Sequence, residues 1–209
     1  IIREMGAEVE MEKVTGIADQ GAHKTVFAGN KAFEAKAVII AVGVRHRQLG
    51  LPNENQLVGN GVSYCAVCDG AFFKGQTVGV VGGGNSALQE AILLSETSKK
   101  VYVVQNLDFL TGEPQLQEIL KKRENVEIIL GTVVDSIKDG DSFSGITVKR
   151  VADGVKTELE LDGMFVAIGQ QPENEPFKDV VKLNDYGYII SDESCIPETD
   201  KKGIFTAGD

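Results

Sequence analysis

The 209-residue sequence predicts an α/β fold, and three observations support this prediction. Thr77–Val81 and Lys100–Val104 are short apolar runs typical of buried parallel strands, and a helical stretch, Leu88–Ser95, lies between them. The glycine-rich segment Gly82–Ala87 joins the first strand to that helix. Further along the chain, Asp-Gly pairs separate additional strands. Together these features predict a Rossmann-like, three-layer ββα nucleotide-binding domain.

The segments before this domain are predicted to be strands followed by a connector. Residues 7–43 contain Glu8–Glu12, which alternates with period 2, and Ala37–Val42, a continuous apolar run of the buried type. Residues 48–59 are rich in Gly, Pro and Asn, which is the composition of a connecting loop.

The segments after the glycine-rich turn alternate between helix and strand. Pro114–Lys122 is predicted to be a helix with Pro in its first turn, and Val126–Leu130 a strand. Met164–Ile168 and Gly203–Ala207 are also predicted strands, the second within a loop-rich region, 170–209. Hairpin turns are predicted at three pairs: Asp139-Gly140, Asp153-Gly154 and Asp162-Gly163.

The composition excludes several classes of protein. The net charge is −10, there is no basic block and Trp is absent, so we expect no nucleic-acid partner. No apolar run approaches the ~20 residues of a membrane span. Three cysteines are too few for a disulfide scaffold and suit a reducing compartment, so we expect a cytoplasmic protein. The chain starts and stops within predicted elements, so we expect it to be truncated at both ends.

The segment after the first strand fits the pattern G-x-G-x-x-A. Gly82 permits a tight turn, Gly84 permits close approach of a pyrophosphate, and Ala87 packs the helix on the sheet. Asn85 stands at the helix start, where free N–H groups attract phosphate. These four residues are predicted to bind a dinucleotide cofactor. The alternative is a glycine-rich turn without a ligand.

The end of the second strand disfavours both nicotinamide cofactors. NAD requires an acidic residue there for the ribose hydroxyls, and NADP requires Arg or Lys for the 2′-phosphate. The sequence instead has Gln105, Asn106, Leu107 and Thr111, and Asp108 comes too late to contact the ribose. We therefore expect neither NADPH nor NADH to bind well.

The pattern C-x-x-C-D at Cys65, Cys68 and Asp69 is the sharpest chemical signal in the chain. Two thiols at this spacing can form a redox-active disulfide, and Asp69 can transfer a proton during exchange. The alternative is half of a zinc site, whose remaining ligands would have to come from the scattered Cys195, His23 and His46. We favour the redox interpretation, predict no metal site, and interpret Cys195 as a buried or idle thiol.

Four segments in order resemble the low-molecular-weight bacterial thioredoxin reductases. These are Gly61–Gly70, Val80–Ala87, Phe165–Gly169 with Pro172, and Gly203–Asp209. The resemblance covers essentially the whole chain. It implies a discontinuous FAD-binding domain, residues 1–47 and 170–209, around a pyridine-nucleotide-type domain, residues 48–169, that carries the C-x-x-C.

The resemblance also implies roles for individual residues. Cys65 and Cys68 would exchange electrons with the flavin, with Cys68 nearer the isoalloxazine and Cys65 attacking thioredoxin. Asp69 would be the proton donor, and the protein would be a homodimer. The residues along the FAD would be Val9, Gly43, Gly208 and Asp209.

Two departures from the family pattern qualify this hypothesis. The N-terminal FAD fingerprint of the family would lie before Ile1, so the FAD site is incomplete in this chain. The basic residues that hold the NADPH phosphate are replaced by Gln105–Thr111, which resembles the ferredoxin-linked flavoprotein subgroup. The leading hypothesis is a flavin-dependent thioredoxin reductase that is not driven by NADPH, with ferredoxin as a candidate donor. The alternatives are the reductase component of an alkyl hydroperoxide system and a non-enzymatic zinc-binding or thiol-sensing module.

Overall fold

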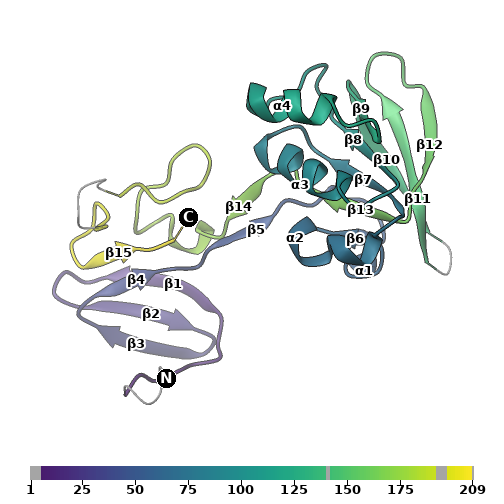
Figure 1. The fold of residues 1–209 in the computed structure, drawn as a ribbon. Coiled ribbons are helices and arrows are strands. Elements are labelled where there is room, and N and C mark those ends of the chain that lie inside the picture. The colour runs from purple at the N-terminus through teal and green to yellow at the C-terminus, as the bar shows by residue number, and fades with distance from the viewer. Residues whose placement is uncertain (1–5, 140–141, 192–196, 209) are drawn as a thin grey trace. The chain divides into compact units, whose positions relative to one another are not determined.

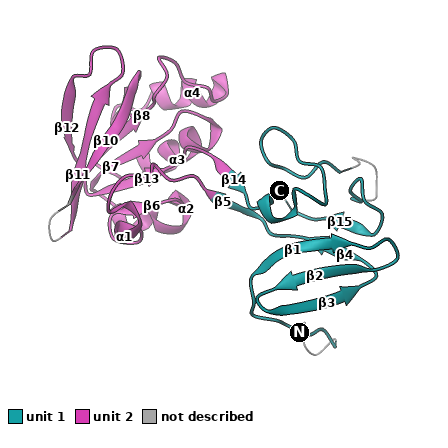
Figure 2. Cartoon of the chain, turned by 180° about the vertical axis from the view of Figure 1, so that it is seen from behind, with its two compact units in different colours: residues 1–45, 171–209 teal, residues 46–170 magenta. Residues whose placement is uncertain are grey.

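The computed structural model describes residues 6–139, 142–191 and 197–208, which fold into two compact units (Figure 2). Unit 1 comprises Ile1–Arg45 and Gln171–Asp209, and unit 2 comprises His46–Gln170. The strands β5 (Val44–His46) and β14 (Gln170–Pro172) pair where the chain passes between the units. Cys195, Asp209 and Gly140 of the first predicted turn lie outside the described residues.

Unit 2 is built on a five-stranded parallel sheet of order β6-β13-β7-β8-β9 (Figure 1). Its strands are β6 (Val62–Ser63), β13 (Gly163–Val166), β7 (Thr77–Val81), β8 (Lys100–Val104) and β9 (Val126–Ile129). The predictions for β7 and β8 are confirmed in full. After their first residues, Thr77 and Lys100, both strands are apolar on both faces, which is the pattern of a strand covered by other layers on either side.

Two different layers cover the parallel sheet. Helices α3 (Asn85–Ser95) and α4 (Pro114–Lys121) pack with Val78 and Val80 of β7 in one apolar cluster. Val81, which points to the opposite face, packs against an antiparallel sheet in a second cluster. The antiparallel sheet consists of β10 (Thr132–Asp139), β11 (Phe143–Arg150) and β12 (Lys156–Glu160). The predicted three-layer ββα fold is therefore confirmed.

Short helices lie around the first parallel strand of unit 2. These are α1 (Glu54–Leu57), α2 (Ala66–Asp69) and a 3₁₀ turn, η2 (Gly70–Phe73). None of the helices in the described part of the chain has the length and apolarity of a membrane span.

Unit 1 contains two small sheets. The strands β1 (Val14–Asp19), β2 (Lys24–Ala28) and β3 (Lys31–Ala35) form an antiparallel meander, whereas β4 (Val38–Ile40) and β15 (Ile204–Thr206) pair in parallel. A 3₁₀ turn, η3 (Glu175–Phe177), follows β14. The apolar cluster of unit 1 contains these buried side chains: Ile17, Ile40, Phe177, Val181 and Ile204.

Three local predictions are wrong. Glu8–Glu12 is not a strand, because the segment pairs with no described strand and its apolar side chains stay exposed, Met11 by 87%. In the Ala37–Val42 run, Ile39 is 67% exposed, so the run is not buried throughout. Asp162-Gly163 is not a hairpin turn, since it carries the chain from β12 into β13 of the parallel sheet. The Asp153-Gly154 turn between β11 and β12 is confirmed.

Candidate functional site

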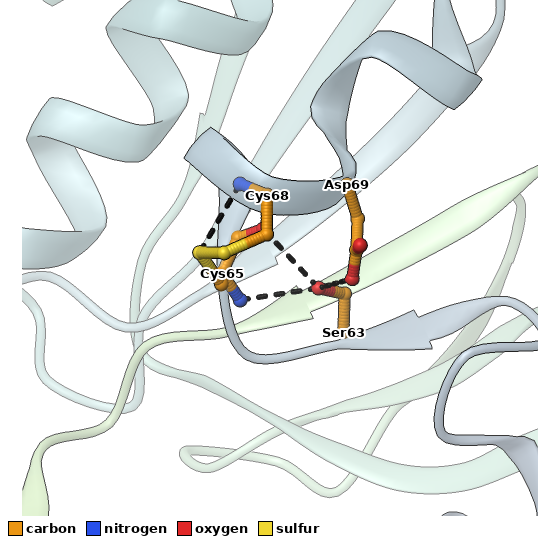
Figure 3. The surroundings of a disulfide bond; sticks show 4 residues. All are labelled: Ser63, Cys65, Cys68 and Asp69. Carbon is orange, nitrogen blue, oxygen red and sulfur yellow. Dashed lines mark hydrogen bonds between the residues drawn. A yellow bond between two sulfur atoms is a disulfide. The ribbon is translucent and has the colours of Figure 1, made fainter. Parts of the chain in front are cut away.

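The structure brings Cys65 and Cys68 together in a disulfide (Figure 3). Their sulfur atoms are bonded at 2.09 Å and their Cα atoms lie 5.3 Å apart. Cys65 precedes the first residue of α2, and its sulfur accepts a hydrogen bond from the Cys68 backbone N–H at 3.1 Å. The two cysteines are three residues apart and lie on one helical turn, so their sulfur atoms are close enough to bond.

Ser63 ties Asp69 to the backbone of the disulfide turn (Figure 3). Its hydroxyl donates to Asp69 Oδ2 at 2.7 Å and accepts from the Cys65 N–H at 3.1 Å. Ser63 is buried, at 4% exposure, so both bonds are largely shielded from water. Sequence reasoning assigned no role to Ser63, because its burial and its contact with Asp69 depend on the fold.

A buried carboxylate anchors the segment that leads into Cys65. Glu54 is 1% exposed and accepts hydrogen bonds from the Tyr64 hydroxyl and from the Gly50 N–H, both at 2.8 Å. Burial, followed by the hydrogen bond to Glu54, raises the pKa of Tyr64 well above its usual value. The ring of His46 stacks on Tyr64 with centroids 5.5 Å apart. Tyr64, the residue before Cys65, is thus held in place by Glu54 and by His46.

The disulfide is accessible, and exposed apolar residues lie near it in sequence. Cys68 is exposed and Cys65 is half-buried. Two large apolar side chains are exposed to solvent, Val67 of α2 by 83% and Phe72 of η2 by 78%. An accessible disulfide within exposed apolar side chains suits a macromolecular partner, because docking would bury this area.

The glycine motif forms the predicted turn between β7 and α3. Gly82 has a φ of +133°, and a Cβ there would lie 2.3 Å from the Ala167 carbonyl oxygen, so glycine is required. Ala87 is fully buried, as close packing of helix on strand demands. Asn85 opens α3, but its side-chain amide donates to Glu113 Oε1 at 3.0 Å and its oxygen accepts from the Glu113 N–H. Asn85 is therefore already hydrogen-bonded within the protein.

A cavity of about 660 Å³ lies against this motif, within unit 2. Asn106, Leu107 and Thr111 line it, and none of the described residues that line it carries a charge. Gln105 also contributes, but it is 5% exposed and its amide donates to the Phe109 carbonyl at 3.4 Å. It packs so closely on Gly83 that a Cβ there would lie 2.5 Å from the Gln105 side chain. The Gln105 amide thus stabilises the loop that contains Phe109.

The residues expected along FAD are only partly brought together. Gly43 and Gly208 line one cavity of about 100 Å³ in unit 1, at one end of the β4–β15 pair. Both have a left-handed φ, +69° and +103°, and open space where a Cβ would be. Val9 instead lines a different cavity, of about 720 Å³, against β1–β3. The fourth residue, Asp209, is outside the described range.

The ligands considered for zinc are not gathered in the described part of the chain. His23 lies in unit 1, and His46 is stacked on Tyr64 in unit 2. Among the described residues no group of three or more His, Cys, Asp or Glu side chains is arranged to hold a metal ion.

A family model described as pyridine nucleotide-disulphide oxidoreductase matches residues 2–209. The chain is 40% identical over 208 residues to thioredoxin reductase of Listeria monocytogenes and 38% identical to that of Bacillus subtilis. Each match covers 99% of this chain and 65% of the relative, so the chain spans about two thirds of the length of these relatives.

Solved structures give the same result. The crystal structure of Lactococcus lactis thioredoxin reductase superimposes with a TM-score of 0.83 at 36% identity, over 100% of this chain and 68% of that one. The predicted resemblance to thioredoxin reductases is confirmed by these matches.

Proposed function

The chain belongs to the pyridine nucleotide-disulphide oxidoreductase family, and from that premise we propose that it is part of a thioredoxin-disulfide reductase. The observation that carries the proposal is the Cys65–Cys68 disulfide, which is accessible and has a carboxylate, Asp69, tethered beside it. The similarity to thioredoxin reductases over 99% of the chain supports thioredoxin as the disulfide that is reduced.

The reaction of the reduced pair is thiol–disulfide exchange. The Cys65 thiolate attacks one sulfur of the thioredoxin disulfide, which forms a mixed disulfide and releases one thioredoxin thiolate. The Cys68 thiolate then attacks the Cys65 sulfur, which restores the internal disulfide and releases the second thiolate. Two electrons pass to thioredoxin, and the two protons lost by the cysteine thiols end on its sulfurs. Asp69 carries a proton between these groups.

The environment of the disulfide supports a protein substrate. Val67, between the two cysteines in sequence, and Phe72, in the following 3₁₀ turn, are exposed apolar side chains, and hydrophobic side chains of this kind form the centre of protein interfaces. We assign Cys65 to the attack on thioredoxin and Cys68 to the side of the flavin, as the resemblance implies.

Unit 1 is proposed to contribute to the FAD site. Gly43 and Gly208 have open, left-handed backbone at one cavity, which fits close approach of a dinucleotide. A cavity of about 100 Å³ has room for only part of a dinucleotide, so we assign Gly43 and Gly208 to one edge of the site. Val9, which lines a different cavity, and Asp209 are assigned to the FAD site on the resemblance alone. Bound FAD would supply the two electrons that reduce the disulfide. On the same resemblance we propose a homodimer, in the cytoplasm.

Unit 2 does not fit NADPH. The 2′-phosphate needs fixed cations, and the cavity at the glycine motif is lined by neutral described residues. NADH lacks its acidic ribose partner in the same way, because Gln105 is buried and neutral. We therefore propose that the electrons come from a one-electron carrier such as reduced ferredoxin.

An anaerobic stopped-flow experiment on the full-length protein tests the proposal. The flavin absorbance is followed after mixing with NADPH, NADH or reduced ferredoxin, and thioredoxin thiols are then quantified. We expect ferredoxin to bleach the flavin and generate thioredoxin thiols, and millimolar NADPH to do so slowly or not at all. Rapid bleaching by micromolar NADPH would reject the proposed donor, and absence of thioredoxin thiols with every donor would reject the reductase. Sedimentation of the same protein measures its oligomeric state.

A further inference from the structure

Tyr64 links the disulfide turn to a buried carboxylate. Its hydroxyl donates to Glu54 Oε1 at 2.8 Å, and Glu54 is 1% exposed. The same carboxylate accepts from the backbone N–H groups of Leu49 at 3.0 Å and Gly50 at 2.8 Å. Both oxygens of Glu54 therefore act as hydrogen-bond acceptors. The Tyr64 hydroxyl is thus held by a side chain that is itself fixed to the backbone of another segment.

The place of Tyr64 in the chain makes this link relevant to Cys65. The parallel pairing of β6 with β13 ends at Ser63, which is paired with Phe165. Cys65 directly precedes α2, which is only four residues long. Tyr64 lies between these two elements and belongs to neither. Its side chain therefore supplies contacts that a strand or a helix would otherwise provide.

The ring of Tyr64 is fixed as well as its hydroxyl. The imidazole of His46 stacks on it, with centroids 5.5 Å apart and planes inclined by 23°. The next residue, Arg47, donates its backbone N–H to the Gly169 carbonyl at 3.0 Å. His46 and Glu54 both belong to unit 2. The two anchors of Tyr64 thus lie in the unit that carries the disulfide.

We propose that Tyr64, anchored to Glu54, is a positioning residue for the redox pair: it holds the chain before Cys65 in place when the disulfide is open, so that the Cys65 and Cys68 sulfurs stay close enough to bond again. In the oxidised protein the disulfide itself constrains both cysteines. That constraint is lost on reduction, and an anchor outside residues 65–68 then limits the motion of Cys65. This inference rests on the proposed dithiol function of Cys65 and Cys68.

Two other hydrogen bonds hold Cys65 and share this role. Its backbone N–H donates to Ser63 Oγ at 3.1 Å, and its carbonyl accepts from the Asp69 N–H at 3.1 Å. Both bonds fix the peptide groups of Cys65 itself. The bond between Tyr64 and Glu54 adds a contact with a segment ten residues earlier in the chain. Loss of that bond should therefore weaken the positioning without abolishing it.

The expected size of the effect follows from the entropy of one residue. Fixing the backbone of one residue changes an equilibrium constant by about five- to thirtyfold. Because Ser63 and Asp69 still hold Cys65, we expect the low end of this range, about fivefold, when the Tyr64 hydroxyl is removed. The dithiol state gains freedom, so the disulfide becomes easier to reduce. A tenfold change in the constant corresponds to about 30 mV for a two-electron couple, so a fivefold change corresponds to about 20 mV.

The test is Tyr64→Phe, which removes the hydroxyl and keeps the ring, with Tyr186→Phe as the control at an exposed tyrosine of unit 1. The full-length protein is equilibrated with graded ratios of reduced to oxidised dithiothreitol and alkylated, and the peptide that contains Cys65 and Cys68 is quantified by mass spectrometry. We expect the reduction potential of the pair to rise by about 20 mV in Tyr64→Phe and to stay constant in Tyr186→Phe. A contact that only stabilises the fold would leave the potential unchanged. An unchanged or lowered potential in Tyr64→Phe overturns the proposal.

Glu54→Gln tests whether Tyr64 acts through the carboxylate. An amide has one acceptor oxygen, so it cannot accept at both positions as Glu54 does. We expect Glu54→Gln to raise the potential, and we expect the variant that combines it with Tyr64→Phe to shift the potential by less than the sum of the two single shifts. Additive shifts would show that the two side chains act independently, and they overturn the proposed anchor.

Hydrogen exchange in the unmodified protein covers the case in which a variant does not fold. The backbone N–H of Cys65 is followed in the oxidised and in the chemically reduced state. We expect similar exchange rates in both states, because the anchored chain stays in place when the disulfide is open. Much faster exchange in the reduced state overturns the proposal. These measurements use neither thioredoxin nor a flavin donor, so their failure is distinguishable from failure of the proposed reductase.

Discussion

The disulfide turn and the cavity at the glycine motif belong to the same unit but differ in charge. Asp69 is tethered beside the sulfur atoms, and Glu54 is buried under the preceding tyrosine. The cavity, in contrast, is lined by neutral described residues. Exchange at a disulfide requires groups that move protons, and recognition of a 2′-phosphate requires cations. The difference supports the proposal that unit 2 carries out dithiol exchange without binding NADPH.

The largest expected effect concerns the disulfide side of this comparison. Cys65→Ser and Cys68→Ser should each abolish thioredoxin reduction by the full-length protein, because exchange needs one sulfur to attack and one to resolve. Flavin absorbance should be retained in both variants. Cys195→Ser is the control, and we expect it to keep full turnover. Turnover near the unmodified rate in either variant of the pair would show that these thiols are not the relay.

The second prediction supplies the charge that the cavity lacks. Asn106, Leu107 and Thr111 line the cavity and are exposed, so long side chains can be accommodated there. Replacing all three with Arg should tighten NADPH binding at least about a hundredfold, since each charge-assisted hydrogen bond contributes about 1.5–3 kcal/mol.

NADH is the matched control for the three arginines, because it lacks the 2′-phosphate. Isothermal titration of the purified variant with both nucleotides provides the measurement. Equal gains for NADPH and NADH would mean that the arginines act on the pyrophosphate, and the comparison between the two regions would then need another explanation.

The third prediction compares Gly82, whose backbone conformation requires glycine, with Gly84, which is predicted to permit close approach of a ligand. Gly82→Ala should destabilise the protein by about 2 kcal/mol or more, because of its positive φ and the 2.3 Å approach to Ala167. Gly84→Ala should be nearly neutral, since its φ is −85° and the nearest atom to a Cβ is Thr111 Oγ1 at 3.8 Å. Urea unfolding of both variants gives the comparison, and similar losses in the two would contradict it.

The sequence predicted the parallel core of unit 2 well and the first segment of unit 1 poorly. β7 and β8 are buried on both faces, so their apolar runs are intrinsic to their place in the sheet. The alternation at Glu8–Glu12 is compatible with a strand, but a strand also needs a neighbouring strand to pair with. The local sequence does not show whether such a neighbour is present. The Asp162-Gly163 pair fits a chain reversal and equally a crossing between layers, where the Asp162 carboxylate accepts from the Thr77 N–H.

The site was predictable to the extent that its chemistry follows from spacing. Cys65 and Cys68 sit on one helical turn, so the motif alone places them together. Ser63 was missed because serine is a common residue, and its role depends on its burial and on its contacts with Asp69 and the Cys65 backbone.

The fourth prediction tests whether the tether at Asp69 matters. Ser63→Ala removes a buried hydrogen bond to a carboxylate and leaves the Cys65 N–H without its acceptor, so we expect a stability loss of about 1.5–3 kcal/mol. The rate of exchange with thioredoxin should fall, and its pH profile should shift, because Asp69 is no longer oriented. Ser144→Ala, which removes an exposed hydrogen bond to Lys138, is the control. An unshifted pH profile would limit Ser63 to a purely structural role.

The smallest expected effect concerns the charge nearest in sequence to the neutral cavity. Asp135 directly follows the cavity-lining Val134, and it is paired with Lys156 at 2.7 Å and Lys149 at 3.3 Å. Hydrogen bonding to Lys156, the largest cause, holds the pKa of Asp135 below its usual value of 3.8. A depressed carboxyl pKa contributes stability above the unfolded-state pKa, and this contribution is lost as the pH falls through the folded-state pKa.

Lys156→Gln should therefore lower the melting temperature slightly at pH 5–7 and have no effect below the folded-state pKa of Asp135. The effect is small because the Lys156 side chain is 59% exposed, so water screens the ion pair. Lys122→Gln, which removes the same charge from the exposed end of α4, should show no such dependence on pH. Melting curves between pH 2 and 7 decide the matter. If Lys156→Gln changes the melting temperature by the same amount at every pH in this range, Asp135 is not the partner through which Lys156 acts.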